Sequence, residues 1–260
     1  MSALRVAIAQ LPMQWTTACN LVQIEAALRL AAARGAALCV LPELALTGFH
    51  RQIRTEAVAE TVDAALAQLQ AACRALDIAC AVGAPTFGAG GAIYNSCLFI
   101  DERGARVGQV DKTGLTVAEA TFFHGGRGRP VALLRGLKTS AVMCREIEDL
   151  ALVRHHLPAG AAELIVWPGL MGRAPDGEEV VDIEALAQQQ ARQAQAHVVQ
   201  SNWPNALNLP DDSPFQAALG ASKVFSPAGD RLLMLPPRAS GVGTFDLGAT
   251  EFAWDALPAP

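Results

Sequence analysis

The stretch that decides the fold is Gly35-Ala-Ala-Leu-Cys-Val-Leu-Pro-Glu43, an apolar run that ends in a proline and a glutamate. Before it, Asn20 and Gln23 form a capping signal that predicts a helix ending at Gly35. The short apolar run at 37–41 predicts a buried strand. A strand that follows a helix so closely indicates an α/β fold with a sheet covered by helices.

The same order of elements continues on both sides of this stretch. We expect a strand over 5–10, a helix whose apolar stripe runs from Val62 to Leu76, and a strand over 78–82. Strands over 94–100 and 105–110 flank a turn ending at Gly104, which is the form of a β-hairpin. The sheet is therefore predicted to be mixed.

The second half of the chain repeats the pattern. Strands are expected over 137–143, 163–167 and 197–200, helices over 150–157 and 180–196, and a hairpin at 226–230. Gly35-Ala-Ala and Gly160-Ala-Ala each precede a strand, and Gly104 and Gly229 turn the hairpins at the same spacing. We therefore expect two similar sheets packed face to face, helices outside, in one domain over 1–260 with a tail at about 250–260.

Composition excludes several classes of protein. With 52% hydrophobic and 17% charged residues the chain is not disordered, and a net charge of −5 without a basic run argues against nucleic acid as a partner. The longest uncharged stretch holds several glycines and a proline, which a single membrane-spanning helix would not contain together. No membrane partner is therefore expected. Six cysteines without a Cys-x-x-Cys pair, and an N-terminal apolar run too short for a secretory signal, predict a cytoplasmic protein.

Three polar residues follow predicted strands, where side chains leave the core but stay anchored to a rigid element. They are Glu43 after 38–42, Lys112 after 107–111 and Cys144 after 139–143. Each has an ordinary explanation taken alone: a solvated glutamate, half of a surface ion pair, and an inert buried thiol. Their joint occurrence is more specific.

The chain resembles the nitrilase, or carbon-nitrogen hydrolase, superfamily over nearly its whole length. The motifs that carry the resemblance occur in the order Val6-Ala-Ile-Ala-Gln10, Leu41-Pro-Glu43, Tyr94-Asn95-Ser96, Lys112-Thr-Gly-Leu115, Glu119 with Phe122-Phe123, Val142-Met-Cys144, Trp167-Pro168, Gly220-Ala-Ser222 and Ser226-Pro-Ala-Gly229. Each fragment is weak by itself, but their order along the chain is specific.

The resemblance implies a four-layer αββα sandwich with two mixed sheets. It also implies a Glu-Lys-Cys site at Glu43, Lys112 and Cys144, with Glu119 as a supporting carboxylate. Such a site hydrolyses small amides through a cysteine thioester, with glutamate as base and lysine at the oxyanion. It implies no metal or other cofactor, and assembly as a homodimer or larger homo-oligomer.

The sequence departs from the family pattern beside the nucleophile. Gly114 stands where many members have histidine, and Arg145 stands where many have an aromatic residue. Arg145 and Arg173 are candidates for binding a substrate carboxylate. For Arg145 the alternative is an ion pair with one of the nearby acidic residues, Glu146, Glu148 or Asp149.

Several alternatives stay open at this point. The substrate could be an N-carbamoyl compound or a nitrile rather than an amide. A Cys-His hydrolase is a rival mechanism, because His155 and His156 fall on the helix after Cys144. A different class of function also stays open for this fold: a catalytically inactive binding or scaffold protein.

Overall fold

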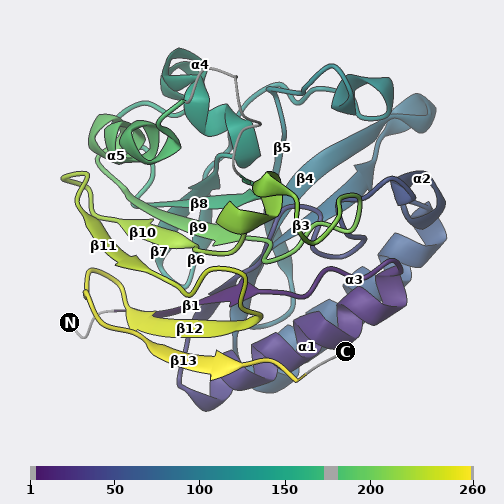
Figure 1. Cartoon of the computed structure of the whole chain (residues 1–260), viewed down its shortest axis with the longest axis horizontal. Helices are drawn as coiled ribbons and strands as arrows, with labels where there is room; N and C mark the ends of the chain where they lie inside the picture. The colour runs from purple at the N-terminus through teal and green to yellow at the C-terminus, as the bar shows by residue number, and fades with distance from the viewer. Residues whose placement is uncertain (1–3, 173–180, 259–260) are drawn as a thin grey trace.

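Two β-sheets form the centre of the molecule in this computed structural model, which describes residues 4–172 and 181–258 (Figure 1). Within these residues one sheet has seven strands in the order β13-β12-β1-β2-β3-β4-β5, and the other has six in the order β11-β10-β9-β8-β7-β6. The strands of the first sheet are β1 (Arg5–Gln10), β2 (Leu38–Val40), β3 (Ala79–Phe87), β4 (Ile93–Ile100), β5 (Arg106–Asp111), β12 (Gly241–Asp246) and β13 (Ala253–Ala256). Those of the second are β6 (Ala132–Leu134), β7 (Leu137–Ala141), β8 (Leu164–Gly169), β9 (His197–Asn202), β10 (Lys223–Phe225) and β11 (Arg231–Met234).

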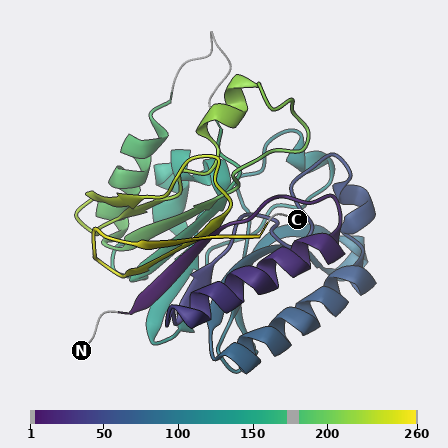
Figure 2. The same cartoon turned by 60° about the horizontal axis from the view of Figure 1, so that its bottom comes forward.

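Helices cover the outer face of each sheet. The α-helices are α1 (Thr17–Ala33), α2 (Ile53–Glu56), α3 (Ala59–Leu76), α4 (Leu150–His156) and α5 (Ile183–Ala194). Short 3-10 helices are η1 (Ala89–Gly91), η2 (Glu119–Thr121), η3 (Cys144–Glu148) and η4 (Pro214–Ala218). Figure 2 shows α1 and α3 side by side on one sheet and α5 on the opposite side of the molecule. The four-layer αββα sandwich is thus confirmed.

Side-chain alternation along the strands builds the layers. In β1, Val6 and Ile8 belong to the buried cluster between the two sheets, whereas Ala7 and Ala9 belong to the cluster under α1 and α3. Successive side chains of a strand point to opposite faces, so a strand buried on both faces must be apolar throughout. A third buried cluster packs α4 and α5 against the other sheet. This arrangement accounts for the high apolar content of the chain.

The two sheets repeat one connection pattern. Strands β1, β2 and β3 pair in parallel, and β4 and β5 then pair antiparallel. Strands β7, β8 and β9 pair in parallel, and β10 and β11 follow antiparallel in the same way. An antiparallel strand, β12 or β6, flanks the first strand of each set. The internal repeat predicted from the glycine spacing is present in the topology.

Two of the differences from the sequence-based expectations have a clear physical cause. Helix α1 begins at Thr17, one turn before the expected signal, because the Thr16 side chain accepts a hydrogen bond from the backbone N–H of Cys19. The expected tail at about 250–260 contains β13, whose residues pair antiparallel with β12. The Trp254 side chain packs against the cluster between the sheets, and this contact holds the added strand in place.

No helix within the described ranges, 4–172 and 181–258, is both long enough and apolar enough to cross a membrane.

Candidate active site

Glu43 lies just beyond the carboxyl end of β2, in a loop fixed from two sides. Its backbone carbonyl accepts a 2.8 Å hydrogen bond from Trp203 Nε1. On the other side lies Gly83 of β3, where an added Cβ would collide with the backbone of residues 42–44. The glycine therefore allows β3 to approach this loop closely, and the loop carries the carboxylate into the interior, where it is fully buried.

Lys112 follows β5 and places its ammonium between two carboxylates. Its Nζ donates to Glu43 Oε1 at 2.8 Å and to Glu119 Oε1 at 2.5 Å. Asn95 Nδ2 donates to the same oxygen of Glu43 at 2.8 Å. Lys112 is 1% exposed, and such a buried charge is stable only where it is paired and hydrogen-bonded.

Glu119 is held in turn by its own backbone surroundings. Its Oε2 accepts a hydrogen bond from the Thr116 N–H at 2.8 Å, and the Thr116 hydroxyl accepts one from the Glu119 N–H at 3.2 Å. These reciprocal bonds fix η2 in the position from which Glu119 meets Lys112. The supporting carboxylate that the resemblance implied is therefore in contact with the lysine.

Cys144 is the first residue of η3, and Val142 and Met143 separate it from the end of β7. It has a left-handed backbone with φ of 50°. Such a conformation costs free energy for a residue with a Cβ, and residues of this kind concentrate at functional sites. Trp167 Nε1 donates to the Cys144 carbonyl at 2.9 Å and holds this turn. The Sγ atom lies 3.4 Å from Met171 Sδ.

Cys144 and Lys112 open into one cavity of about 260 Å³. Its polar lining includes Thr116, Glu119 and Arg145, and its apolar lining is Phe49, Leu170, Met171 and Phe215. Apolar walls with a few convergent polar groups are typical of sites for small molecules.

The charges of the site shift the pKa values of its groups. Burial raises the pKa of Glu43, and the nearby Lys112 only partly offsets this. Burial also raises the pKa of the Cys144 thiol, and the charge of Glu43 raises it further, so the resting group is a thiol and not a thiolate. Burial would lower the pKa of Lys112, but the carboxylates of Glu43 and Glu119 raise it above its ordinary value. The lysine is therefore protonated at neutral pH.

A second buried ion pair lies beside the site. Glu146 accepts hydrogen bonds from the N–H groups of Thr113, Gly114 and Met143, and it pairs with Arg129 at 2.8 Å. Burial alone would raise the Glu146 pKa, but Arg129 and the backbone donors lower it to about 2.

Of the two arginines expected as candidates for substrate binding, the structure describes only Arg145. Arg145 lines the cavity, but its side chain is 57% exposed and pairs with Glu148 at 3.0 Å. This ion pair was the expected alternative to a substrate contact. Arg173 lies outside the residues that the structure describes.

Within the described part of the chain, no histidine lines the cavity or hydrogen-bonds to the Cys144 sulfur. His155 and His156 lie on α4, with their rings tilted against each other. This geometry does not support the Cys-His mechanism. Among the same residues no group of three or more potential metal-ligating side chains occurs.

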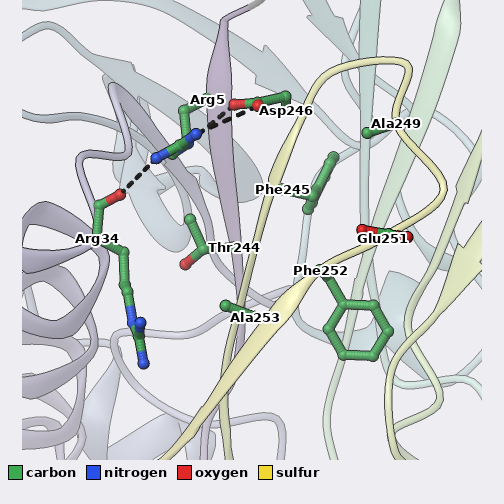
Figure 3. A pocket seen from close by; sticks show the side chains of 9 residues that line it. All are labelled: Arg5, Arg34, Thr244, Phe245, Asp246, Ala249, Glu251, Phe252 and Ala253. Atoms are coloured by element: carbon green, nitrogen blue, oxygen red, sulfur yellow. Dashed lines mark hydrogen bonds and ion pairs between the residues drawn. The ribbon is translucent and has the colours of Figure 1, made fainter.

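A larger surface pocket lies away from these groups (Figure 3). Its polar wall is formed by exposed ion pairs, in which Arg5 contacts Asp246 and also donates to the Arg34 carbonyl. No cysteine lines this pocket, and its arginines already have acidic partners, since Arg34 pairs with Asp255. We therefore place the candidate active site at Cys144 and not at this pocket.

Sequence reasoning overlooked two residues that shape the site. Asn95 formed part of a quoted motif, but its hydrogen bond to Glu43 was not anticipated. Arg129 lies in a loop before β6, and its side chain is buried against Glu146. The local sequence contains no signal for the Arg129 contact, because Glu146 lies between Arg145 and Ile147 and two further acidic residues follow.

Comparison with known proteins agrees with this geometry. Residues 5–251 match the family described as carbon-nitrogen hydrolase. No curated protein matches the sequence significantly.

Among solved structures, a cysteine-to-alanine variant of the Nesterenkonia AN1 amidase from the nitrilase superfamily has a TM-score of 0.79 and 25% identity, covering 94% of this chain and 90% of that chain. A further structure of an amidase from Nesterenkonia sp. has a TM-score of 0.76 and 26% identity, with the same coverage. A glutamate-to-glutamine variant of the AN1 amidase, with a TM-score of 0.76, 25% identity and the same coverage, shows covalent addition of the acetamide moiety of fluoroacetamide at its active-site cysteine. The match over nearly the whole chain, together with the buried acid, lysine and cysteine, shows that this chain is an enzyme of the carbon-nitrogen hydrolase family.

Proposed function

We propose that the protein is a small-molecule amidase that works through a thioester on Cys144. The observation that carries the proposal is the cavity that Cys144 shares with Lys112 and Glu119, where the lysine ammonium is 2.8 Å from Glu43. A nucleophile, a base and a fixed cation thus converge from three separate segments of the chain.

The acylation step follows from the protonation states. Because the resting thiol is protonated, Glu43 takes the Sγ proton as the sulfur attacks the amide carbon. Glu43 Oε2 suits this role, since this buried oxygen has no hydrogen-bond partner among the described residues, while Oε1 is occupied by Lys112 and Asn95. Glu43 then gives the proton to the leaving nitrogen as the C–N bond breaks, which releases ammonia or an amine and leaves the thioester.

Deacylation uses the same groups in the opposite direction. Glu43 removes a proton from a water molecule, and the resulting hydroxide attacks the thioester carbon. The C–S bond breaks, the carboxylic acid is released, and the thiol recovers its proton from Glu43. One carboxylate therefore serves both halves of the reaction.

Lys112 stabilises the oxyanion that forms in each half. The ammonium is desolvated and fixed by two carboxylates, so it needs no reorganisation when the carbonyl oxygen becomes negative. The backbone N–H of Arg145 is the proposed second donor. Glu119 keeps Lys112 in position, and the coupled protonation of the three groups belongs to the cluster as a whole.

Amides lead the substrate classes because the similar structures are amidases, and one of them, a cysteine-to-alanine variant, was solved in complex with butyramide. N-carbamoyl compounds and nitriles are the alternatives that the same three groups could serve. Arg145 stays a candidate for a substrate carboxylate, because its ion pair with Glu148 is solvent-exposed and therefore weak. Arg173 stays a candidate of the same kind.

The assembly is also a proposal. We propose a homodimer or larger homo-oligomer. Exposed apolar side chains on the edge strands β5 and β6 support this, since Val107 is 40% exposed and Leu133 is 65% exposed. Light scattering of the purified protein tests this. The cytoplasmic location stays a prediction.

Intact-mass spectrometry tests the reaction. The protein is incubated with a panel of amides, N-carbamoyl compounds and nitriles, and with fluoroacetamide as a trap. Because Cys19 is an exposed thiol, the Cys19→Ser variant serves as the background protein. We expect an acyl or alkyl adduct that peptide mapping places on Cys144, and release of ammonia from the amide substrates.

The Cys144→Ser variant in the same background is the matched control and should give no thioester. An adduct on Cys144 with turnover of nitriles or N-carbamoyl compounds alone would replace the amide assignment. Absence of adduct and turnover over the whole panel would support the non-catalytic scaffold alternative.

A further inference from the structure

The catalytic groups come from different sheets, and this raises the question of what sets their relative position. Lys112 follows β5 of the seven-stranded sheet, whereas Cys144 follows β7 of the six-stranded sheet. Hydrogen-bond ladders fix strands within each sheet. Between the sheets, position depends on side-chain contacts, and an error of about 1 Å in such a site is enough to cost about 100-fold in rate.

Glu146 makes contacts to both segments with one carboxylate. Its Oε1 accepts from the N–H groups of Thr113 at 2.7 Å and Gly114 at 2.8 Å, directly after the lysine. Its Oε2 accepts from the Met143 N–H at 2.8 Å, directly before the cysteine. The carboxylate thus joins the backbone on both sides of the catalytic gap.

Arg129 completes the connection. Its Nη1 donates to Glu146 Oε2 at 2.8 Å and to the Ala141 carbonyl at 3.1 Å, at the end of β7. Its Nη2 donates to the Thr113 hydroxyl at 2.9 Å and lies 2.8 Å from Glu146 Oε1. The planar guanidinium therefore repeats the bridge made by the carboxylate, with two-pronged geometry that lysine does not reproduce.

The absence of a side chain at residue 114 permits this arrangement. A Cβ on Gly114 would lie 3.1 Å from Glu146 Cγ, closer than an ordinary contact. Glu146 does not supply charge to the catalytic cluster, since Arg129 neutralises it. Its contacts instead fix the distance between the Lys112 and Cys144 segments.

We propose that Arg129 and Glu146, called the clamp below, are positioning residues that hold the Lys112 and Cys144 segments in register across the two sheets. This inference rests on the proposed function of those two residues. Loss of the clamp would leave each catalytic side chain chemically intact but displaced relative to the other.

Two variants test the clamp in the Cys19→Ser background. Glu146→Gln keeps size and removes the charge, and Arg129→Lys keeps charge and removes the two-pronged donor. We expect the rate of Cys144 alkylation by iodoacetamide, per folded molecule, to fall by about 100-fold in Glu146→Gln and less in Arg129→Lys. We also expect alkylation to follow thiolate formation at alkaline pH, because Glu43 no longer assists proton removal.

Two controls separate positioning from loss of stability. Arg34→Lys makes the same substitution in a two-pronged but exposed pair with Asp255. Leu28→Ala opens a cavity in the fully buried cluster under α1 and lowers the melting temperature without touching the site. Both controls should keep the wild-type pH profile of alkylation.

The crystal structure of each clamp variant gives a readout that needs no activity. We expect segments 112–114 and 143–144 to move apart in Glu146→Gln. Wild-type alkylation rates and pH profiles in both folded variants, or unmoved segments, would overturn the proposal. If Glu146→Gln does not fold, the alkylation rate and the crystal structure of Arg129→Lys decide whether the proposal holds. An unreactive Cys144 in the background protein would instead count against the proposed function, and the crystallographic comparison would still decide the clamp.

Discussion

Two sets of ion pairs in this molecule have similar lengths and different environments. Lys112 meets Glu43 at 2.8 Å and Glu119 at 2.5 Å in the interior, whereas Arg34 meets Asp255 at 2.6 Å on the surface. The Lys112 side chain is 1% exposed and the Arg34 side chain 50%. Exposed pairs are screened by water and salt, while buried pairs leave an uncompensated charge when one partner is lost. Distance alone therefore says little about what a pair does.

Lys112→Met should give the largest effect. It leaves Glu43 and Glu119 buried without their cation, so we expect the free energy of unfolding to fall by about 3–5 kcal/mol. Loss of the oxyanion contact should reduce kcat by a further factor of about 100–1000. Urea unfolding and steady-state kinetics on the folded fraction measure the two losses separately. A stable, active Lys112→Met protein would contradict both roles.

Glu43→Gln should separate activity from stability. We expect kcat/KM to fall by about 100–10000-fold, since the general base is lost. Burial raises the Glu43 pKa, so its ionised form opposes folding at neutral pH. Lys112 keeps Glu119 as its partner in this variant, so the amide should leave stability unchanged or raise it. In the wild type, the acid limb of the kcat/KM profile should lie above the usual glutamate range and should disappear in Glu43→Gln. A large loss of stability would show that the carboxylate is mainly structural.

The buried pair of Glu146 and Arg129 should make the free energy of unfolding depend on pH in acid, which an exposed pair would do only weakly. The pKa of Glu146 falls from 4.5 to about 2 on folding, so its contribution is complete above about 4.5 and is lost as the pH drops towards 2. Wild-type unfolding free energy should therefore decline through this window, and the decline should be shallower in Glu146→Gln. Urea titrations at closely spaced pH values test this, and equal slopes in the two proteins would refute it.

Arg34→Met should give the smallest effect. Its hydrogen bond and charge lower the pKa of Asp255, but both groups are in contact with solvent. We expect the urea midpoint and the kinetic constants to match those of the wild type. Addition of 1 M salt should leave the two urea midpoints equal to each other. A stability loss comparable to that of Lys112→Met would remove the distinction between the two environments.

Much of the architecture was predictable from local patterns. Apolar runs and glycine spacing predicted most of the strands, the longer helices and the repeated halves, because burial on both faces requires such residues. The strands β6 and β12 and the short helix α2 were not predicted. Glu43, Lys112 and Cys144 stood out because each follows a predicted strand. The β13 strand was missed, since its proline-rich surroundings favour a tail and only pairing with β12 orders it.

The contacts between distant segments were less predictable. Asn95, Arg129 and Trp203 meet the site residues from elements far away in the sequence, and no spacing rule relates them. Glu119 was identified through the resemblance alone. Periodicity reports which face of an element is buried, but not which partner it meets there.

Gly83 illustrates a consequence for anyone who varies this enzyme. It contributes no atom to the chemistry, yet even a methyl group there would push the loop that presents Glu43. In a library covering every position we expect alanine at 83 to be as poorly tolerated as replacement of the acid itself. The lack of a side chain at one strand position is thus as much a part of the catalyst as the groups that react.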